Sequence, residues 1–138
     1  MKAFSLNFVV LLLTGLFGIG AGLAAEHYGL TRTQSAAGVT ARVTYVNLPG
    51  GDEVHFVVVL DTGMVDLLPY DLKALSFTRD DTGKSYLPTG FVEGKGGSHH
   101  HREVILSFPK PTPKGRWLEL VIRDIAAVKE RTFRWDLK

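Results

Sequence analysis

Three consecutive histidines, His99, His100 and His101, are the residues of this chain best suited to chemistry. They follow a glycine-rich stretch, residues 94–98, and precede alternating apolar residues that predict a strand. If the strand begins near His99, side chains two positions apart share one face, so His99 and His101 can reach the same ion. Because neutral imidazole suits zinc, copper, nickel and iron, we expect a transition-metal site, with copper or zinc as the ion.

Such a site needs further ligands, since zinc takes four protein ligands, or three and a water molecule. His55 lies on another predicted strand and, with His100, is a reserve ligand. Oxygen ligands are available from Asp61, Asp66 and Glu103. The alternative interpretation is a solvated surface run that holds no metal, and the sequence leaves both interpretations open.

Other reactive residue types lack the neighbours that catalysis requires. Ser98 stands beside the histidines without the Gly-x-Ser-x-Gly turn that exposes a nucleophilic serine. Asp61, Asp66 and Asp71 lack the Asp-x-Asp-x-Asp-Gly spacing of a calcium loop. The chain has no cysteine, which excludes disulfides, thiolate ligands and a cysteine nucleophile. We therefore predict a binding module and not an enzyme.

The first 25 residues have the composition of an export segment. Lys2 precedes residues 5–25, which carry no charge and end in small residues around Ala24, as a cleavable signal peptide does. The same stretch is long enough to be an uncleaved membrane anchor, or a buried helix. In the first two cases the rest of the chain is extracytoplasmic: periplasmic, secreted, or tethered to the membrane through residues 5–25.

The composition is that of an ordinary globular domain, with 45% hydrophobic and 22% charged residues, and this balance excludes a disordered chain. The formal net charge is only +2 and no basic stripe stands out, so we expect no nucleic-acid partner. Residues 26–38 are polar and small, which predicts a flexible linker. Residues 39–138 then make one domain.

From Val39 onward the hydrophobic period is two, which predicts strands. The expected strands cover residues 39–47, 53–62, 72–79, 85–87, 89–92, 102–108, 117–123 and 131–137. Pro88 favours a sheet edge, and residues 63–71 read as a crossover between sheets in which Tyr70 bonds to backbone at a corner. About seven strands without a convincing helix predict an all-β fold, a single antiparallel β-sandwich of immunoglobulin-like or Greek-key type. A small barrel is the alternative.

Several motifs carry a resemblance to a protein family. They occupy residues 43–48, 61–67, 70–72, 97–102, 122–124 and 131–135. The set resembles small exported prokaryotic β-proteins of uncharacterised function, in which one motif reads Asn-Thr-His-x-Val-Asp-Leu and a later one Gly-Gly-His-His-Arg. This chain departs from the pattern at Gly63, where the family has a histidine. If that histidine binds a metal, this chain has lost a ligand, which His55 or the extra histidine of the triplet would replace.

The sequence thus predicts an extracytoplasmic binding module with His99, His101, His100 and His55 as metal ligands. The alternative is a structural or interaction subunit of a cell-envelope complex, which would have a protein partner and no metal site.

Overall fold

The computed structural model describes residues 30–48 and 50–137, where the chain forms nine strands and one short helix. Residues 1–25, the predicted export segment, lie outside these ranges. Within them, no helix is long and apolar enough to cross a bilayer. The strands belong to the compact unit Arg32–Lys138, apart from the first residue of the first strand.

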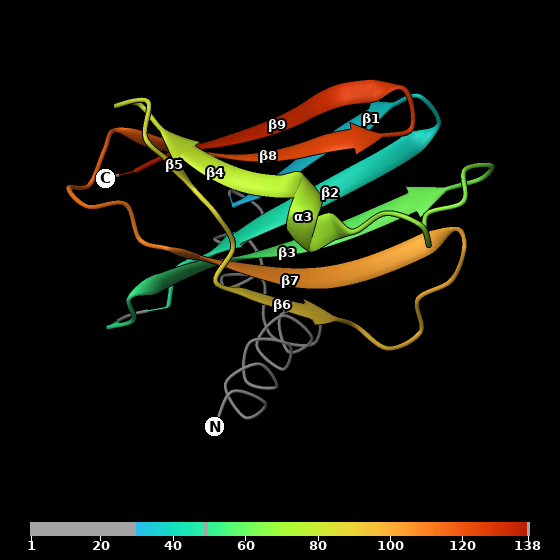
Figure 1. The fold of residues 1–138 in the computed structure, drawn as a ribbon, viewed down its shortest axis with the longest axis horizontal. Coiled ribbons are helices and arrows are strands. Elements are labelled where there is room, and N and C mark those ends of the chain that lie inside the picture. The colour runs from blue at the N-terminus through green and yellow to red at the C-terminus, as the bar shows by residue number, and fades with distance from the viewer. Residues whose placement is uncertain (1–29, 49, 138) are drawn as a thin grey trace, which may run out of the picture. The chain divides into compact units, whose positions relative to one another are not determined.

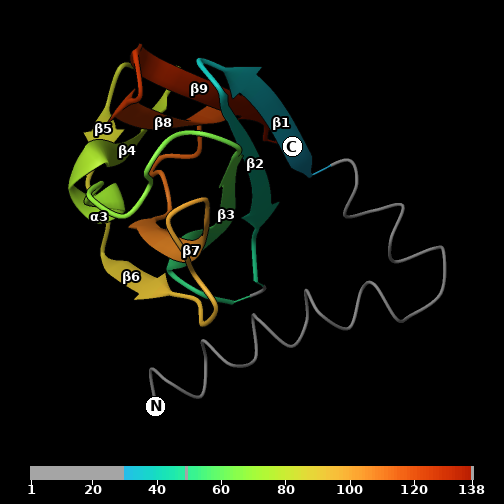
Figure 2. The ribbon, with the colours of Figure 1, turned by 90° about the vertical axis from the view of Figure 1, so that its right-hand side faces the viewer.

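The strands form two antiparallel sheets packed face to face (Figures 1 and 2). Sheet A has the order β1-β2-β3-β7-β6, and sheet B has the order β5-β4-β8-β9. The strands of sheet A are β1 (Thr31–Ala36), β2 (Val39–Val46), β3 (Glu53–Thr62), β6 (Gly90–Glu93) and β7 (His101–Pro109). Those of sheet B are β4 (Ser76–Asp80), β5 (Ser85–Tyr86), β8 (Trp117–Ile125) and β9 (Val128–Asp136). The predicted antiparallel sandwich is confirmed.

An aromatic cluster joins the two sheets at the core. Phe56 on β3 is fully buried, and its ring centroid lies 5.7 Å from that of Phe108 on β7 and 5.2 Å from that of Trp135 on β9. Because Trp135 belongs to sheet B, these contacts hold the sheets together. Truncating a buried aromatic side chain of this kind costs about 3–5 kcal/mol of folding free energy.

Strand β1 corrects the prediction of a flexible linker over residues 26–38, because Thr31–Ala36 are hydrogen-bonded into sheet A. A two-residue turn, Ala37 and Gly38, joins β1 to β2, with φ values of 51° and 77°. Positive φ at both positions is the mark of the tight turn that matches the twist of a hairpin. Alanine rarely takes this conformation, so the sequence carried no signal for the hairpin.

A single helical turn, α3 (Leu72–Leu75), replaces the first half of the strand expected over residues 72–79. Asp71 caps it, because its carboxylate accepts a hydrogen bond from the Ala74 N–H at 3.2 Å. Leu72 is buried, and the Ser76 hydroxyl donates to the Leu72 carbonyl at 2.6 Å. The strand itself, β4, starts only at Ser76.

The chain passes between the sheets three times: after β3, after β5 and after β7. The first passage is the predicted crossover, residues 63–71, in which the Tyr70 hydroxyl accepts a hydrogen bond from the Ala126 N–H at 2.9 Å. This confirms the bond predicted at the corner. Pro88 lies in the second passage, between β5 and β6, each of which is an edge strand as the proline predicted.

Candidate functional site

The histidine triplet forms a tight turn that opens β7. Ser98 and His101 pair with each other, with the Ser98 N–H donating to the His101 carbonyl at 2.8 Å, so His99 and His100 occupy the tip. We call residues 98–101 the histidine turn. The strand starts at His101, one residue before the expected range of 102–108, so the condition of a strand that begins near His99 is not met. Strand alternation therefore does not place His99 and His101 on one face.

His101 lies between two carboxylates on the outer face of sheet A. Its direct cross-strand partner is Asp61 on β3, whose Oδ1 is 2.5 Å from Nδ1 of the ring. Glu103, two positions along β7, has Oε2 3.9 Å from Nε2. An ionised carboxylate only accepts hydrogen bonds, so in the neutral ring a proton shared with Asp61 sits on Nδ1 and leaves a lone pair on Nε2, the nitrogen that faces Glu103. The His101 side chain is 40% exposed, so this lone pair is open to a ligand from solvent.

His99 has a carboxylate partner of its own. Its Nδ1 lies 2.9 Å from Oδ1 of Asp66, a residue of the crossover. The hydrogen bond from His99, supported by one from the Leu68 N–H, holds the pKa of Asp66 below its ordinary value, so this carboxyl group is ionised at neutral pH. His100 is exposed at the tip of the histidine turn, where its N–H donates to Ser98 Oγ.

Backbone hydrogen bonds tie the crossover to the histidine turn. The Thr62 N–H donates to the His100 carbonyl at 3.1 Å, and the Leu67 N–H donates to the His99 carbonyl at 2.7 Å. Both segments lie at the end of the sandwich that faces the viewer in Figure 2. The three carboxylates named from the sequence as available oxygen ligands, Asp61, Asp66 and Glu103, each lie within 4 Å of a histidine ring of this turn.

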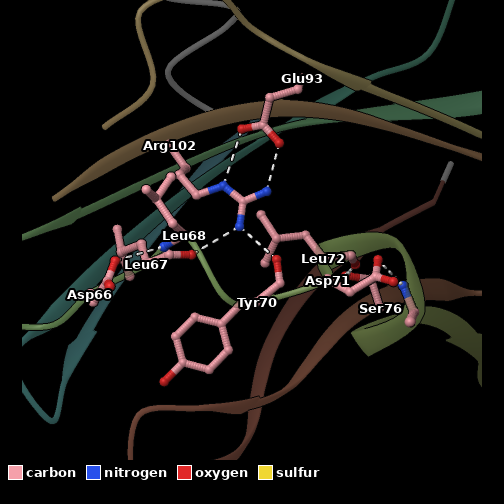
Figure 3. Close-up of polar contacts among 10 residues, drawn as sticks. Asp66, Leu67, Leu68, Tyr70, Asp71, Leu72, Ser76, Glu93 and Arg102 are labelled. Atoms are coloured by element: carbon pink, nitrogen blue, oxygen red, sulfur yellow. Dashed lines mark hydrogen bonds and ion pairs between the residues drawn. The ribbon is translucent and has the colours of Figure 1, made fainter. Parts of the chain in front are cut away.

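Arg102 of β7 links β6 and the crossover through its buried guanidinium group (Figure 3). Its guanidinium, on a residue only 7% exposed, makes two hydrogen bonds to the Glu93 carboxylate of β6, at 3.1 and 2.6 Å. It also donates to the carbonyls of Leu67 and Tyr70 at 2.9 and 2.6 Å. Sequence reasoning missed this role. The available signal was that Arg102 stands two positions before Val104, on the inward face of an alternating strand.

His55 does not join the other histidines. It lies on β3 six positions before Asp61, about 20 Å along the strand. Its Nδ1 is 2.7 Å from the Ser107 hydroxyl, and burial lowers its pKa, although the charge of Glu53 opposes that shift. His55 therefore belongs to a separate contact near the opposite end of sheet A.

In residues 30–48 and 50–137, no three histidine, aspartate or glutamate side chains stand together as a ready-made metal site. The histidine turn instead offers two imidazoles, His99 and His101, each held by a carboxylate on Nδ1. A metal ion would complete its coordination with exposed side chains that turn toward it, or with water.

Comparison with protein-family models, with curated proteins and with solved structures finds no match for this chain.

Proposed function

We propose that this chain is an extracytoplasmic binding module that holds a copper or zinc ion at the histidine turn. His101 is the primary ligand, Glu103 supplies an oxygen ligand, and His99 and His100 complete the site. The observation that carries the proposal is the position of His101, with Asp61 on Nδ1 and Glu103 facing Nε2.

Histidines that bind metals characteristically donate their second ring N–H to a carboxylate, which fixes the tautomer and raises the basicity of the ligand nitrogen. Asp61 stands in that relation to His101, and Asp66 stands in it to His99. This pairing fixes the orientation of both imidazoles, as the carboxylate partners of metal-binding histidines do, and it supports a ligand role.

The distances at His101 are close to those that a shared ion requires. Zinc binds histidine nitrogen and carboxylate oxygen at about 2.0–2.2 Å, so two ligand atoms of one tetrahedral ion lie about 3.4 Å apart. Nε2 of His101 and Oε2 of Glu103 are 3.9 Å apart, and the Glu103 side chain is 52% exposed. A small rotation of this exposed side chain brings both atoms to binding distance.

The decisive experiment is metal analysis and zinc and copper titration of the chain purified without a tag, because a histidine tag would add ligands. We expect about one equivalent of metal, and loss of binding when both His99 and His101 become alanine. His55→Gln is the matched control and leaves binding unchanged, since His55 lies near the other end of sheet A. A wild-type chain that takes up no metal, or a double variant that binds like the wild type, would overturn the proposal.

The extracytoplasmic location rests on residues 1–25. The intact mass of the same preparation tests it directly: a signal peptide predicts a chain that begins after Ala24 or Ala25. An anchor predicts the full-length chain in the membrane fraction. Recovery of the full-length chain from the cytoplasm would contradict export.

A second candidate is an interaction module whose partner is an extended segment of an envelope protein added to the edge strand β6. Two of the exposed large apolar side chains, Leu87 and Val92, lie just before β6 and on it, at 77% and 37% exposure. Strand addition uses such an edge. Cross-linking in native membranes tests this candidate: a partner that is joined to wild type and lost with Val92→Lys supports it, and no cross-link contradicts it.

A further inference from the structure

Met64 lies in the crossover at the histidine end of the sandwich and carries a thioether, a soft type of ligand. It is the only methionine after Met1, and the chain has no cysteine. Its side chain is 80% exposed, the highest value among the large hydrophobic residues in the described ranges. Core packing therefore does not account for a methionine here.

Local hydrogen bonds fix the backbone of Met64 beside the carboxylates of the site. The Thr62 hydroxyl accepts from the N–H groups of Met64 and Val65, at 3.2 and 3.1 Å, and donates to the Gly38 carbonyl at 2.7 Å. The resulting turn lies between Asp61 and Asp66, the two residues that hold His101 and His99.

Two backbone hydrogen bonds to the histidine turn lie on either side of Met64 in the sequence. The Thr62 N–H donates to the His100 carbonyl, and the Leu67 N–H donates to the His99 carbonyl. The Met64 sulfur rests over Gly38, 3.5 Å from where a Cβ on that glycine would be. Methionine has flexible side-chain bonds, and at 80% exposure little holds the sulfur in place. The sulfur is therefore free to turn from Gly38 toward the histidine turn.

We propose that Met64 is a ligand of copper(I) at the histidine turn and that it selects copper(I) over zinc. The inference rests on the proposed function, because it adds a ligand to the same site. Thioether sulfur favours copper(I), whereas imidazole and carboxylate ligands also suit zinc. Without Met64 the site offers only nitrogen and oxygen atoms, so the thioether decides which ion is preferred.

The test is a pair of titrations on the purified, untagged chain: copper(I) under anaerobic conditions against a competing copper(I) chelator, and zinc against a zinc indicator. We expect Met64→Leu to weaken copper(I) binding at least about tenfold, since even the loss of a residue behind a ligand costs 10–100-fold. Zinc affinity stays unchanged. Leu68→Ala, an exposed apolar residue of the same crossover, is the matched control and changes neither affinity.

X-ray absorption of the copper(I) complex gives an independent result. We expect a sulfur atom bound to copper in the wild type and none in Met64→Leu, and with no cysteine in the chain the loss assigns that sulfur to Met64. If zinc binding depends on His101 but Met64→Leu binds copper(I) like the wild type, the inference is wrong and the histidine site stands. If the wild type binds neither ion, the proposed function is wrong as well.

Discussion

The Asp61 carboxylate holds the Nδ1 atom of His101 from the neighbouring strand, at 2.5 Å, and the two residues are direct partners in the β3–β7 register. The position of this imidazole is therefore set by the pairing of two strands, with a hydrophobic core beneath them, although the ring itself lies at the surface. If His101 binds a metal ion as we propose, its ring needs little reorganisation when the ion arrives.

Asp61→Asn is expected to weaken zinc binding by about 10–100-fold, because the ionised acceptor that orients His101 is replaced by a neutral amide. Both side chains are half exposed, so the fold should be unaffected. A zinc titration of the variant measures the effect. Asp52→Asn, in the loop between β2 and β3, is the control. Equal affinity in Asp61→Asn and wild type would show that the pair has no part in binding.

Gly63→His is expected to strengthen zinc binding about tenfold or more, because it adds an imidazole to a site with too few protein ligands. A Cβ added at Gly63 meets no atom within 4 Å, and φ is not in the left-handed region. The new side chain is therefore accommodated without strain. Gly63→Ala separates the effect of the imidazole from that of the backbone. An affinity equal to that of Gly63→Ala would place residue 63 outside the site.

Arg102→Lys is expected to lower the free energy of unfolding by about 1.5–3 kcal/mol, the scale of one hydrogen bond to a charged group. An ammonium group cannot bond to the Glu93 carboxylate and to two carbonyls in the planar pattern of a guanidinium. Chemical denaturation measures the loss, and zinc affinity should fall with it because the crossover that carries Asp66 is loosened. Arg42→Lys, at an exposed position, is the control. Unchanged stability in Arg102→Lys would contradict the anchoring role.

Glu119→Gln is expected to destabilise the fold by about 1.5–3 kcal/mol at neutral pH. Burial raises the pKa of Glu119, but hydrogen bonds from Arg79 at 2.7 Å and Arg134 at 2.9 Å outweigh it and leave the pKa below its ordinary value. A carboxyl group with a lowered pKa in the folded state stabilises the protein above its unfolded pKa of about 4.3, and the contribution is lost as pH falls through the folded value.

The difference between wild type and Glu119→Gln should therefore be constant above about pH 4.3 and shrink below it. Unfolding curves recorded at several pH values test this. Glu130→Gln is the control, since that side chain is 47% exposed and 3.8 Å from Arg79. A difference that persists unchanged into acid would contradict the role of the Glu119 charge.

Features that depend on side-chain period were predictable from the sequence. The alternation of β7 predicted that Val104, Leu106 and Phe108 share one face, and all three are buried in the core. The corner bond of Tyr70 was also predicted, from its place after Pro69 in a passage between sheets.

Features that depend on a few local bonds were not predictable. Ala37 adopts a positive φ because the β1–β2 hairpin demands it, and its sequence gives no sign of that. The hydrogen bonds of Ser98 with His101 turn His99 and His100 into a loop tip, which removes the face that strand alternation would have given them. The distance of His55 from the triplet depends on the β3–β7 register, which is a property of the assembled sheet.

Two backbone hydrogen bonds join the crossover to the histidine turn, from Thr62 to His100 and from Leu67 to His99, so we expect these segments to open as one unit. The amide protons of Thr62 and Leu67 should therefore show the same free energy of opening in hydrogen exchange, that of the local opening of this end of the sandwich. A ligand that binds the imidazoles would slow both together. These two amides thus report occupancy of the site from within the chain, without a label.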